Sequence, residues 1–148
     1  MARHLIFVFV LLAGAGIPVQ VASNHKLGEA IKSPVWGVSI SLLIGGLAAA
    51  LLALSGLVHR GHLSGASSGP WWAWVGGLLS AAVVIASIIA LPISGAGAVI
   101  AATVFGQLVA AAILDHFGWL GVPQIRINWW RICGVVLLFG GALLMQKK

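Results

Sequence analysis

Two acidic residues occur in the chain, and one of them stands beside a histidine near several arginines. Asp115 directly precedes His116, whereas the other acid, Glu29, lies far away in the sequence. A carboxylate next to an imidazole can take up and release protons. It can equally form a static ion pair with Arg126 or Arg131, because an acid at a helix C-terminus is not stabilised by the helix dipole. The residue types leave both interpretations open.

Neutral polar side chains interrupt two apolar stretches and could contact a solute. Gln20 and Asn24 are four residues apart, so they share one face of a helix. Pro18 just before them removes a backbone hydrogen bond and loosens that helix. Thr103 and Gln107 repeat the spacing of four. All four side chains could instead form hydrogen bonds between helices, and the hydroxyl of Thr103 is expected to bond its own helix.

Enzyme chemistry and metal binding have little support in this sequence. Catalysis needs at least two reactive side chains together, and neither acid falls in a metal-binding motif. His59 and His62 are three residues apart, but no acid lies near them. A single cysteine, Cys133, excludes an intrachain disulfide and a cysteine metal cluster. We therefore predict a protein that is not an enzyme and has no catalytic site, metal site or cofactor.

Five apolar runs carry most of the chain, and none of them contains Asp, Glu, Lys, Arg or His. The runs are roughly Leu5–Ala22, Val35–Val58, Trp71–Leu91, Gly95–Leu114 and Ile132–Met145. A charge at mid-bilayer costs at least a few kcal/mol, so lipid explains this segregation. Only 7% of the residues are charged, against about 25% in soluble domains. We predict an all-α, polytopic membrane protein whose five transmembrane helices form a single domain over residues 1–148. The helices are expected at about residues 3–24, 35–58, 71–91, 95–114 and 128–146.

The first apolar run and the connections between runs shape the expected topology. Ala13–Ala15 resembles a secretory cleavage site, but four more runs follow, so we expect the first run to be retained as a helix. Ser23–Pro34 is polar and is expected to connect the first two helices. Pro92–Gly95 is so short that the third and fourth helices should form an antiparallel hairpin.

Small residues recur every four positions in the second and fourth helices. Gly37, Ser41 and Gly45 share one face, and Gly106 belongs to a similar row in the fourth helix. Such rows let helix backbones approach closely. They predict helix packing, either within one bundle or across a dimer face.

The basic residues are divided equally between the two sides of the membrane. With five spans, the two groups of four are Arg3, Arg60, Arg126 and Arg131 on the N-terminal side, and Lys26, Lys32, Lys147 and Lys148 on the other. The positive-inside rule requires an excess on the cytoplasmic side, so this balance favours insertion in both orientations. Two oppositely oriented copies would form an antiparallel pair with a two-fold axis in the membrane plane. The alternative is one orientation set by folding or by a partner subunit.

Three segments of the chain carry a recognisable order of residues. They comprise Gly16, Pro18, Gln20, Asn24 and Leu27; then Pro70, Trp71, Trp72, Trp74, Gly76 and Gly77; then Gly106, Gln107, Asp115, His116, Phe117, Gly118, Gly121, Arg131 and Gly134. This order resembles the small, half-size, five-helix family of the drug/metabolite transporter superfamily, which is related to the EamA-like transporters. Ser80 departs from the glycine-like residue expected there.

The resemblance implies a ten-helix transporter in the bacterial inner membrane, built from two five-helix halves of opposite orientation. It implies no settled substrate. Four-helix relatives in the same superfamily export hydrophobic cations with a membrane-embedded glutamate in the first helix. The first helix here has no such glutamate, so that activity is not carried over.

These observations predict a secondary transporter of a small polar metabolite that works by alternating access as an antiparallel homodimer. Gln20, Asn24 and Gln107 would bind the substrate, whereas Asp115, His116 and Arg131 would gate or couple transport. The expected partners are the lipid bilayer, a second copy and the solute, but not nucleic acid, because the basic residues are scattered. The alternative is a membrane scaffold or one half of a heteromeric carrier, in which the amides only pack.

Overall fold

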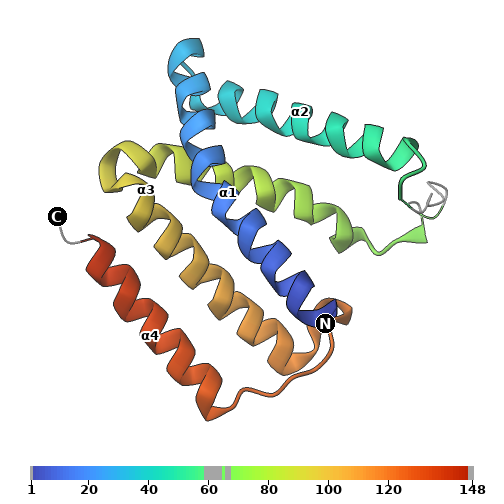
Figure 1. Cartoon of the computed structure of the whole chain (residues 1–148), viewed down its shortest axis with the longest axis vertical. Coiled ribbons are helices and arrows are strands. Elements are labelled where there is room, and N and C mark those ends of the chain that lie inside the picture. The colour runs from blue at the N-terminus through green and yellow to red at the C-terminus, as the bar shows by residue number, and fades with distance from the viewer. Residues whose placement is uncertain (1, 59–64, 66–67, 147–148) are drawn as a thin grey trace. The chain divides into compact units, whose positions relative to one another are not determined.

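The computed structural model describes residues 2–58, 65 and 68–146, and these residues are helical apart from short connections (Figure 1). Four helices are long and apolar enough to cross a membrane, which confirms the all-α class. His59, His62, Arg60, Lys147 and Lys148, as well as the side chain of Arg3, lie outside the described residues. The elements are α1 (Ala2–Ile31), α2 (Pro34–Leu54), η2 (Trp71–Trp74), α3 (Val75–Phe117), η3 (Trp119–Gly121) and α4 (Trp129–Gln146).

The chain divides into two compact units. The terminal unit comprises Met1–Val19 and Ala90–Lys148, and the middle unit comprises Gln20–Ile89. α1 and α3 therefore each contribute to both units. The single five-helix domain stays a prediction.

α1 is longer than the sequence pattern indicated, because it continues to Ile31 instead of ending near residue 24. Most of the polar segment expected to connect the first two helices is thus helical. Its charged residues suit a helix: Lys26 Nζ lies 2.7 Å from Glu29 Oε2, and His25 Nε2 lies 3.4 Å from Glu29 Oε1. Pairs three and four residues apart stabilise a helix. The end of the apolar run is therefore not the end of the helix.

A two-residue turn joins α1 to α2. Lys32 adopts φ 58°, and the N–H of Ser33 donates to the carbonyl of Gly28 at 2.9 Å. This left-handed residue after a helix, with a bond back to an earlier carbonyl, is the usual way to end a helix, although glycine is the preferred residue there. Ser33 Oγ then accepts from Trp36 N at 3.4 Å, and Pro34 opens α2.

Close backbone contact packs α1 against α2 within the middle unit. Gly37 on α2 is buried against Gly28 on α1. A Cβ added at Gly37 would lie 2.7 Å from Gly28 N and 2.8 Å from Gly28 Cα. Because only a residue without a side chain fits there, the two helices meet at their glycines.

α3 is interrupted at Gly95, where φ is 77° and ψ is 159°. Pro92, three residues earlier, has no N–H to donate to the helix. The interruption falls at the predicted Pro92–Gly95 connection. The predicted helix over residues 71–91 begins as the short 3-10 helix η2. The antiparallel arrangement of the helical stretches before and after Gly95 stays a prediction.

In the terminal unit, α4 runs antiparallel to the part of α3 that follows Gly95. Gly97 lies against the end of the Met145 side chain, and the rings of Phe105 and Phe139 pack with their centroids 5.0 Å apart. The contacts therefore move back along α4 as they move forward along α3. This hairpin brings the last turn of α3 to the first turn of α4.

Candidate functional site

An ion pair joins the two ends of this hairpin. Arg131 Nη1 donates to Asp115 Oδ2 at 2.9 Å. The side chains of Arg131 and Asp115 are 31% and 29% exposed, so water screens the pair only in part. Asn128 positions the arginine, because its Oδ1 caps α4 by accepting from Arg131 N at 3.0 Å. Of the two partners considered for Asp115, Arg131 is the one in contact.

The connection between η3 and α4 is hydrogen-bonded to the end of α3. The N–H of Ile125 donates to the carbonyl of Asp115 at 2.7 Å. Gln124 Nε2 donates to the carbonyl of His116 at 3.0 Å, and the N–H of Ile127 donates to His116 Nδ1 at 3.1 Å. His116 also packs edge-on against Phe117, with the ring centroids 4.8 Å apart. The three predicted gating residues thus lie in one network.

Sequence reasoning missed Gln124, Ile127 and Asn128. Asn128 was detectable, because an asparagine just before an apolar helical stretch is a helix-capping signal. Ile127 acts through its backbone, which leaves no trace in the residue type. Gln124 bonds a carbonyl eight positions away, a distance that no helical period predicts.

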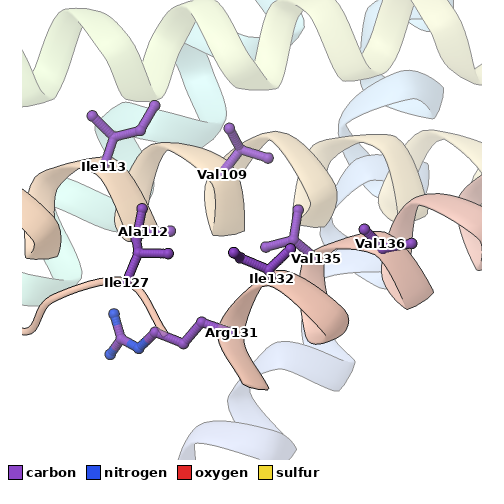
Figure 2. A pocket seen from close by; sticks show the side chains of 8 residues that line it. All are labelled: Val109, Ala112, Ile113, Ile127, Arg131, Ile132, Val135 and Val136. Atoms are coloured by element: carbon purple, nitrogen blue, oxygen red, sulfur yellow. The ribbon is translucent and has the colours of Figure 1, made fainter. Parts of the chain in front are cut away.

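Two hollows flank the ion pair. One of about 200 Å³ is lined by apolar side chains of α3, of α4 and of the loop between η3 and α4, with Arg131 as its charged residue (Figure 2). Figure 2 shows Arg131 at the end of the hollow that carries Ile127. A second hollow of about 240 Å³ is lined by both Asp115 and Arg131 and by apolar residues such as Leu108. The pair therefore forms the polar element of an otherwise apolar surface.

Asn24 is the most buried of the predicted substrate ligands. It is 4% exposed, and its Nδ2 has no hydrogen-bond partner within the described residues. Burial follows from the close approach of α2, because a Cβ added at Gly37 would lie 3.0 Å from the carbonyl oxygen of Asn24. Gln20, one turn earlier on α1, is exposed. An unpartnered buried amide destabilises the fold, which makes Asn24 a candidate for a functional role.

Gln107 lies exposed on α3 in the terminal unit, whereas Gln20 and Asn24 belong to the middle unit. The grouping of these three amides in one site therefore stays a prediction. Thr103 Oγ1 donates to the carbonyl of Val99 at 2.8 Å, which confirms the expected bond within its own helix.

The small residues differ in their surroundings. Gly37 contacts the backbone of α1, and Ser41 is half-buried. Beyond the backbone of their own helix and their chain neighbours, no described heavy atom lies within 4 Å of a Cβ added at Gly45 or Gly106. Gly37 thus serves packing inside the described chain, whereas an interhelical contact at Gly45 or Gly106 stays a prediction.

Comparison with known proteins places the chain in a family. A family model described as "Putative inner membrane exporter, YdcZ", from the drug/metabolite transporter superfamily, matches residues 5–144. No curated protein and no solved structure gives a significant match. The match confirms the resemblance seen in the three sequence segments and the location in the inner membrane. The chain therefore belongs to the YdcZ exporter family of the drug/metabolite transporter superfamily and is a multi-pass protein of the inner membrane.

Proposed function

We propose that the protein is a secondary exporter of a small polar metabolite and works by alternating access as an antiparallel homodimer. Membership of the YdcZ family supports export. The single observation that carries the antiparallel pair is the equal division of eight basic residues between the two sides.

The interruption of α3 supports the proposal of five spans. The apolar stretch from Trp71 to Phe117 has 47 residues. As one continuous helix, at about 1.5 Å per residue, it would be more than twice as long as the roughly 30 Å hydrocarbon layer is thick. The break at Gly95 divides it into two stretches that can each cross the membrane once. In the proposed topology, these two stretches and α1, α2 and α4 are the five spans, and the termini lie on opposite sides.

The substrate site of the proposal contains neutral amides. Asn24 has an unpartnered amide donor, and Gln20 and Gln107 are exposed within apolar helices. Uncharged ligands favour neutral, zwitterionic or weakly anionic solutes, because a bare cation would lack a counter-charge. The pair of Asp115 and Arg131 would open and close access to that site.

Topology in cells tests the antiparallel pair. Single cysteines replace Ser68, between α2 and α3, and Gln146, at the end of α4, in a Cys133→Ala background. Impermeant thiol reagent should label each position from both sides of the membrane. The background variant without a new cysteine should remain unlabelled. Labelling of each position from one side only would exclude dual insertion and favour a partner subunit of opposite orientation.

Export itself is tested by mass spectrometry of the growth medium. Cells that make the protein should release a polar metabolite that cells making Gln107→Leu release less, at equal protein level. If the two media are identical, the amide only packs and a scaffold becomes the better explanation. Thr103→Val is a matched control, because that hydroxyl bonds its own helix.

A further inference from the structure

A histidine side chain holds the loop that leads into α4. The imidazole of His116 accepts the N–H of Ile127 through Nδ1 at 3.1 Å. Since Nδ1 is the acceptor, it carries a lone pair and no proton in this arrangement. Two further bonds, from Ile125 N to the carbonyl of Asp115 and from Gln124 Nε2 to the carbonyl of His116, hold the same loop. The bond to Nδ1 is the one of the three whose acceptor is a ring nitrogen, which becomes a donor when it carries a proton.

Protonation would convert this acceptor into a donor. Both ring nitrogens of an imidazolium carry hydrogen, so Nδ1–H would face the N–H of Ile127. The hydrogen bond would be lost, and two donors would oppose each other. The bond from Ile127 and a proton on Nδ1 therefore exclude each other.

Release of Ile127 would affect the ion pair, because Arg131 lies only one helical turn further along the chain, at the start of α4. The next residue, Asn128, caps α4 through Arg131 N, and the Arg131 side chain reaches Asp115. The position of Ile127 thus sets where α4 begins. Freeing it loosens the cap and the contact between Arg131 and Asp115 that closes the hairpin.

Few other ionisable groups belong to the terminal unit near this loop. Asp115 and Arg131 pair with each other, and Arg126 precedes Ile127 in the loop. From the other helices of the unit, α1 contributes Arg3 and His4 in its sequence, and α4 contributes the half-buried Cys133. Among the groups whose side chains the structure describes, His116 is the one that bonds the loop backbone.

We propose that Nδ1 of His116 is a proton-binding site that couples proton uptake to opening of the gate formed by Asp115 and Arg131. A proton from water adds to the Nδ1 lone pair, the bond from Ile127 breaks, and deprotonation restores it. Coupling to export rests on the proposed function, but release of the loop does not.

The test measures how fast the loop becomes accessible. Val122 in the loop is half-buried, so a cysteine there, in a Cys133→Ala background, reports release through its rate of maleimide labelling. The full chain is studied in lipid nanodiscs between pH 5.5 and 8. His116→Asn is the matched control, because its Oδ1 stands at the same bond separation as Nδ1 and accepts but does not titrate. The labelling rate of the protein with His116 is divided by that of the His116→Asn variant. This ratio cancels the pH dependence of the thiol itself.

The expected ratio is near one at pH 8 and rises at least about fivefold at pH 5.5, because a proton on Nδ1 removes the acceptor of the Ile127 N–H. His116→Ala, which lacks the acceptor, should label fast at both pH values if it folds. A ratio that stays flat with pH would overturn the proposal even if His116→Ala does not fold. Export and dual topology could still hold in that case, so the two proposals fail independently. Conversely, a pH-dependent ratio in a chain that exports nothing would support release of the loop by protonation of His116 and exclude only its coupling to export.

Discussion

Asp115 Oδ2 and Arg131 Nη1 lie 2.9 Å apart although the two residues are 16 positions apart in the chain. The pair closes the open end of the hairpin made by α3 and α4, directly beside the histidine that holds the intervening loop. The proposed gating should therefore depend on it.

Breaking the ion pair should cost little stability but much transport. Asp115→Asn and Arg131→Gln each remove one charge from a pair that is only partly exposed. A double-mutant cycle of thermal unfolding in detergent should give a coupling energy of about 1 kcal/mol. The exchange of charges, Asp115→Arg with Arg131→Asp, should restore more stability than either reversal alone. A coupling energy near zero would contradict a closed pair in the membrane protein.

Replacing Asn24 with leucine should stabilise the fold while impairing export. The buried Nδ2 has no hydrogen-bond partner within the described residues, and burying such a group costs about 1 kcal/mol of folding free energy. An apolar side chain of similar size removes that cost. The readouts are the unfolding temperature in detergent and metabolite release. Gln20→Leu, at an exposed position one turn away, should lower export without the gain in stability. A less stable Asn24→Leu protein would mean that the amide has a partner which the proposal lacks.

A methyl group at Gly37 should separate α1 from α2. Gly37→Ala brings Cβ within 3.0 Å of the Gly28 backbone, and such overpacking costs about 1–3 kcal/mol. Gly45→Ala is the matched control on the same helix, because nothing lies within 4 Å of its Cβ. Unfolding temperatures of the two variants should differ clearly. Equal temperatures would argue against the close contact of Gly28 with Gly37.

Glycine at position 32 should stabilise the turn between α1 and α2. Lys32 holds φ at 58°, a conformation that costs an L-residue roughly 1 kcal/mol and costs glycine almost nothing. Lys32→Gly should therefore unfold at a higher temperature than Lys32→Ala, which loses the same charge but keeps the unfavourable φ. The opposite order would indicate that the turn differs from the one described.

Local features of the sequence were enough to predict the membrane class and the family. Charge-free runs must be buried in lipid, and this requirement depends on composition rather than on contacts. Pro92 and Gly95 likewise marked the interruption of α3, because both act on their own backbone. The bond within the helix at Thr103 was predictable for the same reason.

Contacts between distant residues were decided only by the tertiary structure. The sequence left Arg126 and Arg131 as equal partners for Asp115, and the cap at Asn128 places Arg131 beside the carboxylate. The bond from Ile127 to His116 uses a backbone N–H that every residue except proline has, so no residue type could reveal it. The polar end of α1 was misplaced because hydropathy reports where lipid ends, whereas hydrogen bonds and side-chain pairs determine where a helix ends.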